Sequence, residues 1–61
     1  MPNLSQKDLF CIAKLLEEEK RIAQKYSDYA RLTDDAVIRT FCEKGAARHK
    51  NYYENIFSFL G

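Results

Sequence analysis

The sequence has little of what many functional classes require. Its 61 residues include two glycines and one proline, so the chain is neither disordered nor rich in loops. Ten Lys and Arg side chains are balanced by nine Asp and Glu, which leaves no basic excess for binding nucleic acid. No apolar run approaches the ~18–20 residues that cross a bilayer. We therefore expect one small domain with neither a nucleic-acid nor a membrane partner.

Cysteines and secretion signals are also scarce. Lys7 and Asp8 interrupt the first residues before the apolar core of a signal peptide can form. Cys11 and Cys42 lie 31 positions apart and make no Cys-x-x-Cys pair, whereas small secreted domains usually carry four or more cysteines. We expect a cytoplasmic chain with two buried thiols toward opposite ends of the molecule. A disulfide between subunits stays open.

Signatures of catalysis are missing as well. The chain has no glycine-rich phosphate loop, no Ser/His/Asp set and no pair of carboxylates with the spacing of a hydrolase. We therefore expect no enzymatic activity.

The first helix is predicted over residues 6–31. This segment lacks glycine and proline, and it is dominated by Leu, Lys, Glu and Ala, which favour helices. Ser5, with Asp8 three positions later, resembles a capping box. The helix is therefore expected to begin directly after Ser5.

A turn is predicted over residues 32–34, where the helical pattern breaks. Thr33 or Asp34 can cap a second helix, which is predicted over residues 35–60. Gly45 is the weak point inside this second helix, where it costs up to ~1 kcal/mol against alanine. We interpret Gly45 as a position that another helix approaches closely.

Apolar residues recur in both segments at alternating spacings of three and four, which is typical of helices, and no strand-like alternation persists. Two helices of ~39 Å joined by a short turn form an antiparallel hairpin. The predicted fold is all-α, a single two-helix hairpin over residues 1–61. We call the stripe of residues at these spacings on each helix its seam. The seam of the first helix contains Leu9, Ile12, Leu16, Glu19, Ala23, Tyr26 and Ala30, and that of the second contains Ile38, Cys42, Gly45, His49, Tyr52, Ile56 and Phe59.

Both apolar faces are broader than one hairpin interface needs. Leu15, Ile22 and Tyr29, for example, recur every seven residues beside the first seam. The simplest closed solution is a four-helix bundle made of two hairpins, and two-fold dimers are the commonest oligomers. We predict a homodimer or a higher even oligomer. The residues expected at its interface are Leu9, Ile12, Leu16, Tyr26, Ile38, Gly45, Tyr52 and Ile56.

Glu19 and His49 are polar residues within the two seams. Glu19 precedes Thr33 by 14 residues and His49 follows it by 16, so the hairpin places them within about one helical turn, ~5 Å, of each other. Such a pair can share a proton, form an ion pair or bind a divalent metal. Alternatively, Glu19 accepts a hydrogen bond from Tyr26 or Tyr52 in a polar layer, or a small rotation of the helix leaves it in solvent.

A complete two-metal site is not predicted. Di-iron bundles use a Glu-x-x-His motif, but the residue three positions before His49 is Ala46. A dimer would still bring two copies of Glu19 and His49 near one layer. The metal alternative is therefore a mononuclear or intersubunit site for Fe, Mn or Zn.

Two further groups are interpreted as structural. The tyrosines are expected to pack on the helix faces with their hydroxyls at the edges. The basic stretch of the second helix is expected to face solvent because acidic residues flank it. The tyrosines are Tyr26, Tyr29, Tyr52 and Tyr53, and the basic residues are Lys44, Arg48 and Lys50.

Several motifs between residues 4 and 60 together suggest a family. They are Leu4-Ser5-Gln6-Lys7-Asp8-Leu9 opening the first helix, Glu19-Lys20, Tyr26, Asp34-Asp35, Ile38-Arg39 with Phe41, and His49 followed by Tyr52 or Tyr53. In these the chain resembles the spore coat protein F family.

The resemblance implies a small ferritin-like protein of spore-forming bacteria, a half-bundle that completes itself by dimerising. It also implies a place in the spore coat or the mother-cell cytoplasm, with other coat proteins as further partners. Members often carry Glu-x-x-His on the second helix, but this chain has Ala46 in place of that glutamate. Only Glu19 and His49 therefore carry over as ligands, and a ferroxidase role is not expected.

Three functions remain open at this point. The leading expectation is a structural, self-associating protein, a coat-type component without catalytic activity of its own. The alternative is a ferritin-like metal-binding protein that uses Glu19 and His49 at the bundle core. The third is a helical module that covers its spare face with another protein.

Overall fold

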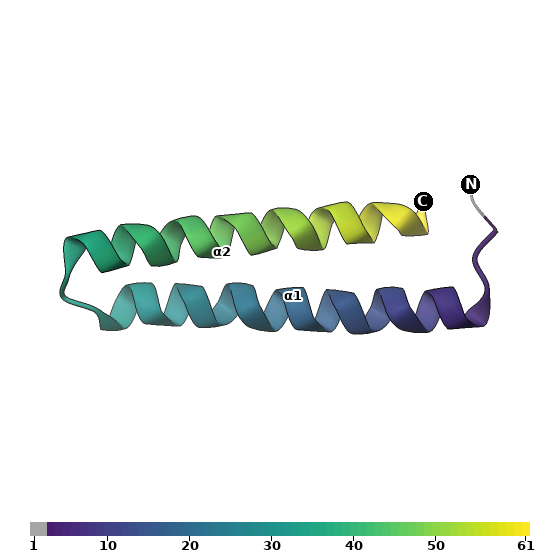
Figure 1. Cartoon of the computed structure of the whole chain (residues 1–61), viewed down its shortest axis with the longest axis horizontal. Coiled ribbons are helices and arrows are strands. Elements are labelled where there is room, and N and C mark those ends of the chain that lie inside the picture. The colour runs from purple at the N-terminus through teal and green to yellow at the C-terminus, as the bar shows by residue number, and fades with distance from the viewer. Residues whose placement is uncertain (1–2) are drawn as a thin grey trace.

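The computed structural model describes residues 3–61, which form a helical hairpin measuring 47 × 16 × 10 Å (Figure 1). Helix α1 spans Gln6–Leu32, helix α2 spans Ala36–Phe57, and a short 3-10 helix, η1, spans Ser58–Leu60. The two long helices run antiparallel, with the connecting turn at one end (Figure 1). The predicted all-α hairpin is therefore confirmed: α1 begins at the predicted residue, and the other three boundaries are shifted by one to three residues.

A capping box starts α1, as the sequence predicts. The Ser5 hydroxyl accepts a hydrogen bond from the Asp8 N–H at 3.1 Å, and the Asp8 carboxylate accepts one from the Ser5 N–H at 3.0 Å. The backbone N–H of Ser5, followed by its side chain, holds the pKa of the Asp8 carboxyl below its ordinary value of 3.8. The cause is that hydrogen bonds to a carboxylate favour its charged form.

Asp35 caps α2. Its Oδ1 accepts hydrogen bonds from the N–H groups of Val37 and Ile38 at 2.8 and 3.0 Å. The prediction of a cap at Thr33 or Asp34 is therefore wrong. The Thr33 hydroxyl accepts from the Asp35 N–H within the turn, which leaves the Asp35 carboxylate beside the free amides of α2.

The last turn of the second helix is tighter than predicted. The α-helical pattern ends at Phe57, and residues Ser58–Leu60 continue as η1. Gly61 follows with φ of 125°, a conformation that glycine adopts without strain. The expectation that Gly61 ends the second helical segment is correct.

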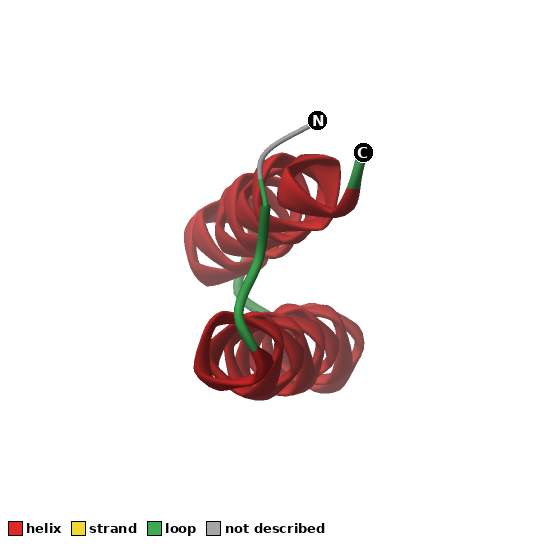
Figure 2. Ribbon diagram, turned by 90° about the vertical axis from the view of Figure 1, so that its right-hand side faces the viewer, coloured by secondary structure: helices red, strands yellow, loops and turns green. Residues whose placement is uncertain are grey.

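The interface between α1 and α2 uses the predicted seams. Ile12 and Ala30 of α1 are buried, and so are Cys42 and Gly45 of α2. Viewed from one end, the described residues form one layer of two helices (Figure 2). Each helix therefore buries one narrow stripe and leaves its flanks exposed.

The two cysteines differ in their surroundings. Cys42 is buried between the helices, whereas Cys11 is exposed. The expectation of two buried thiols is wrong for Cys11, because it lies about 100° around the helix from the buried Ile12 that follows it.

Within residues 3–61, neither long helix combines the length and the apolar character needed to cross a membrane.

Candidate functional site

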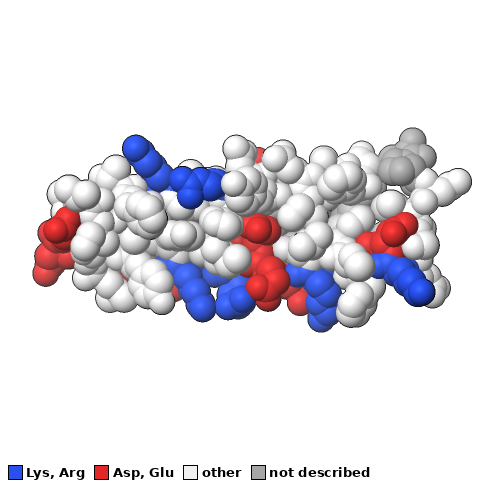
Figure 3. Space-filling model, in the orientation of Figure 1, with Lys and Arg blue, Asp and Glu red and all other residues white. Residues whose placement is uncertain are grey.

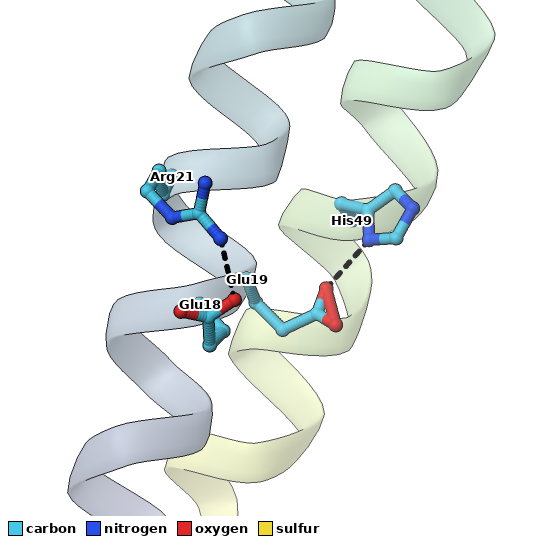
Figure 4. A network of polar contacts seen from close by, with 4 residues as sticks. All are labelled: Glu18, Glu19, Arg21 and His49. Atoms are coloured by element: carbon cyan, nitrogen blue, oxygen red, sulfur yellow. Dashed lines mark hydrogen bonds and ion pairs between the residues drawn. The ribbon is translucent and has the colours of Figure 1, made fainter.

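Glu19 of α1 and His49 of α2 meet halfway along the hairpin (Figure 4). The Nδ1 atom of His49 lies 2.6 Å from Oε2 of Glu19. The two side chains are only 19% exposed for His49 and 17% for Glu19. Their predicted position at one height is therefore confirmed, and the alternative of a solvated Glu19 is wrong.

The contact places an imidazole nitrogen against a carboxylate oxygen. Where the Glu19 carboxylate is ionised, it can only accept a hydrogen bond, and Nδ1 of His49 is then the donor. If the imidazole is charged, the contact is an ion pair; if it is neutral, the contact is a hydrogen bond from the Nδ1–H tautomer. In the neutral tautomer Nε2 keeps the free lone pair, and a metal between Nδ1 and the carboxylate must displace the proton.

Two tyrosine rings hold the imidazole in place. The Tyr26 ring stacks on His49 with a centroid distance of 5.6 Å and an angle of 20° between the ring planes. The Tyr52 ring meets His49 edge-on at 5.1 Å and 84°. The tyrosines thus contact the pair through their rings, and Glu19 uses His49 rather than a tyrosine hydroxyl as its partner.

The three consecutive glutamates of α1 point in different directions. Glu18 pairs with Arg21 at 2.6 Å on the outer side of the helix, where both side chains are more than half exposed (Figure 4). Glu17 lies near Lys14 at 3.6 Å and is also exposed. Only Glu19 turns toward α2, so the polar pair is a feature of the interface and not of a solvated acidic run.

The pair alone is an incomplete metal site. Among residues 3–61 no three His, Cys, Asp or Glu side chains come together as ligands. One hairpin thus supplies two ligands, whereas zinc sites use three or four protein ligands. A second copy or water molecules would have to supply the others.

A second feature is an apolar face along one side of the hairpin. On α1 its members lie three positions after the seam residues Ile12, Glu19 and Tyr26, so they share one flank of the helix. The members on α2 and η1 follow seam residues at the same spacing. We call this surface the aromatic face; its residues are Leu15, Ile22, Tyr29, Phe41, Tyr52 and Phe59. Five of these side chains are exposed, among them Phe41 at 62% and Phe59 at 58%, and Ile22 is partly buried.

The two halves of the aromatic face lie on the same side of the hairpin. The Tyr26 ring, next to this face on α1, contacts the Phe41 ring of α2 at a centroid distance of 6.3 Å. In Figure 3 uncharged side chains cover much of this side, with basic groups on the lower edge and on the left part of the upper edge, and with carboxylates near the middle and toward both ends. The opposite side is a shallow groove of ~430 Å³ lined by Lys20, Ala23, Gln24, Ser27, Ala46, Ala47, Lys50 and Tyr53.

The residues predicted for the oligomer interface divide into two groups. Ile12 and Gly45 are buried within one hairpin, and Leu16, Tyr26 and Ile56 are partly buried there. Leu9, Ile38 and Tyr52 stay exposed. Of the aromatic face the prediction includes Tyr52 alone. The omitted residues are Leu15, Ile22, Tyr29, Phe41 and Phe59, and the signal for Phe41 was its spacing of eleven residues, or three helical turns, from Tyr52.

The remaining predicted groups lie at the edges. Lys44, Arg48 and Lys50 are exposed, as expected of a solvated basic stretch. Tyr53 is partly buried, and its ring stacks near Phe57 at a centroid distance of 6.3 Å.

Comparison of the chain with family models, with curated proteins and with solved structures finds no match. The resemblance to the spore coat protein F family therefore stays a prediction. The features of the described residues that bear on function are the Glu19–His49 pair and the aromatic face.

Proposed function

We propose that this protein is a structural, self-associating helical hairpin that pairs with a second copy to complete a four-helix bundle. The observation that carries the proposal is the number of large apolar side chains in solvent, twelve among the described residues 3–61. Exposed apolar patches of this extent mark association surfaces in soluble proteins. The exposed side chains are Leu9, Phe10, Leu15, Tyr29, Leu32, Val37, Ile38, Phe41, Tyr52, Phe57, Phe59 and Leu60.

The surface area of the hairpin supports the same proposal. Its accessible surface is 4998 Å², whereas a compact monomer of 7.2 kDa exposes about 4100 Å². The excess is roughly 900 Å². A standard protein interface buries about 800 Å² on each partner, so one second copy matches the excess.

In this proposal the protein has no catalytic activity of its own. A coat-type role, with other coat proteins as further partners, depends on the family resemblance alone. Self-association depends on the exposed surface and needs no family assignment.

Sedimentation equilibrium at micromolar concentration tests the proposal. We expect a mass of twice 7.2 kDa, and a helical signal that falls on dilution because the separated hairpin has a thin core. Leu15→Glu should shift the equilibrium to monomer, whereas Gln24→Glu, the same added charge on the groove side of α1, should not. A monomer that stays fully helical would contradict the proposal.

A second candidate function is the binding of a divalent metal at a ferritin-like bundle core. It is favoured by the direct contact of the Glu19 carboxylate with the His49 imidazole, because both are common ligands of Fe, Mn and Zn. Two copies in a dimer would provide four such groups.

Elemental analysis distinguishes the metal site from a polar layer. Tag-free protein would be measured before and after incubation with Fe(II), Mn(II) and Zn(II), with His49→Ala as the matched variant. One-half or one metal per chain, lost in the variant, would support the site. If neither protein contains stoichiometric metal, the Glu19–His49 pair is a polar layer between the helices and not a metal site.

A further inference from the structure

We infer that the Glu19–His49 pairs of two docked copies come to one level at the centre of the interface and align the copies along the helices. The surface between the copies is the aromatic face. This inference rests on the proposed self-association and adds the residues that set the position of the second copy. It holds for either direction of that copy.

The Glu19–His49 pair keeps polar atoms that the hairpin does not satisfy. The contact uses Nδ1 of His49 and Oε2 of Glu19, and within residues 3–61 neither Nε2 of His49 nor Oε1 of Glu19 has a hydrogen-bond partner. No buried side-chain nitrogen or oxygen in this part of the chain lacks a partner, so both free atoms reach water in the single hairpin. A second copy that covers these atoms must therefore offer polar partners of its own.

The open side of the pair lies toward the aromatic face. The His49 ring contacts the ring of Tyr26, which lies next to this face, and the ring of Tyr52, which belongs to it. The groove on the opposite side of the hairpin is lined by neither Glu19 nor His49. A second copy on the aromatic face therefore covers the side of the pair that water reaches in the single hairpin.

The other charged residues near the middle of this face can stay in water. Glu18 and Arg21 form an ion pair on the outer side of α1, where both side chains are more than half exposed. Arg48 of α2 is exposed as well. Such side chains remain hydrated at the rim of an interface, whatever the direction of the partner. The polar atoms that the partner covers are thus those of the pair between the helices.

The pair lies halfway along the hairpin. Glu19 is the central residue of α1, and His49 is level with it because the two side chains touch. A two-fold axis parallel to the helices preserves the height of every residue. An axis that crosses the helices inverts heights about the middle, and full overlap of the copies puts that middle at Glu19. Both arrangements therefore bring the two pairs to the same level.

An aligned copy satisfies the free atoms, and a slipped copy does not. In the aligned dimer the Nε2–H of a charged His49 can donate to the Glu19 carboxylate of the partner, and a water molecule can bridge the two pairs. A copy shifted by two helical turns would place the pair against an apolar part of the partner, where polar atoms without partners are costly. Single polar residues fix the alignment of coiled-coil helices in the same way.

Filtered NOE spectra of a dimer made from isotope-labelled and unlabelled copies test the level of the pairs. The His49 ring of one copy should contact partner residues within four positions of the pair, about 6 Å along the axis, whichever way the partner runs. Contacts only to residues eight or more positions away, about 12 Å or more, or to no partner residue, would overturn the inference. The first set is Leu15, Ile22 and Tyr52, and the second is Tyr29, Phe41 and Phe59.

Apolar replacement tests whether the pair sets the alignment. Glu19→Leu/His49→Leu should still associate, but sedimentation velocity should resolve several species in place of one dimer, because no polar layer then excludes slipped copies. Glu19→Gln/His49→Gln is the matched control, since it keeps polar side chains at both positions, and it should give one dimer. Equal behaviour of the two double variants, or a monomeric leucine variant, would overturn the inference.

The outcomes separate this inference from the proposed function. A wild-type dimer with contacts at the level of the pair supports both. A wild-type dimer with contacts only at other levels overturns the alignment and leaves self-association intact. A wild-type monomer overturns both.

Discussion

The ring of Tyr26 lies so close to Gly45 that a β-carbon at position 45 would be 2.5 Å from its Cδ1 atom. The same ring stacks on His49 and contacts Phe41. Tyr26 thus connects the glycine, the polar pair and the aromatic face. The space beside Gly45 is therefore filled by a side chain of α1 from the same hairpin, and a close approach of another helix backbone at Gly45 stays a prediction.

Replacing Gly45 with alanine should destabilise the protein. Alanine favours a helix by about 1 kcal/mol over glycine. The new methyl group would nevertheless displace a ring that is held by two other aromatic contacts, and such overpacking costs about 1–3 kcal/mol. Urea unfolding of Gly45→Ala should therefore show a lower free energy of unfolding.

A smaller side chain opposite Gly45 provides the control for this prediction. In a Tyr26→Ala background the methyl group has room, so Gly45→Ala should become neutral or stabilising there. An equal or higher stability of the single variant Gly45→Ala would show that the ring moves aside easily.

The Glu19–His49 pair should stabilise the folded state, and replacing one member should lower the free energy of unfolding. Glu19→Leu leaves His49 Nδ1 without its acceptor, and His49→Leu leaves the largely buried carboxylate without its donor. Each should cost about 1–3 kcal/mol. Thermal unfolding of the two single variants and the double variant measures the coupling.

The double variant Glu19→Leu/His49→Leu should be more stable than either single variant, because a polar pair can be replaced by apolar residues with little loss. Single variants as stable as the wild type would mean that the 2.6 Å contact contributes nothing.

The N-cap of α2 should depend on one of two adjacent aspartates. Asp35→Ala removes the acceptor of two backbone N–H groups and should lower the free energy of unfolding by about 1 kcal/mol. Asp34→Ala is the matched control, with the same loss of charge one position earlier. Chemical denaturation of both variants checks the position of the cap. Equal losses in the free energy of unfolding would contradict a cap at Asp35.

The capping box of α1 should weaken in acid. The folded state lowers the pKa of Asp8, so the box contributes stability above the ordinary value of 3.8 and loses it as the pH falls through the lowered folded value. NMR titration should give a higher Asp8 pKa in Ser5→Ala than in the wild type. Because alanine keeps the backbone N–H at position 5, an unchanged pKa would show that the Ser5 side chain adds nothing to the effect of that N–H.

The hairpin and the height of its polar pair could be predicted because both follow from counting residues. Two uninterrupted helical segments and a three-residue break permit one compact arrangement, and a fixed rise per residue then brings Glu19 and His49 to one level. The cap at Asp35 could not be predicted in this way, because three neighbouring residues of the turn carry suitable side chains. Only the path of the turn decides which of them reaches the free amides of α2.

By itself, the sequence determined the two helices, their antiparallel direction and the distance of each residue from the turn, since these depend on local propensity and on a constant rise. The apolar periodicity also predicted the seam of each helix, and the tertiary structure decided the exact rotation of each helix within that seam. That rotation depends on packing between the helices, above all on the Tyr26 ring filling the space that Gly45 leaves. It turns Glu19 inward, leaves Cys11 in solvent and places the aromatic face on one side of the hairpin. Rotating a helix about its axis by a few tens of degrees is enough to exchange a buried position for an exposed one.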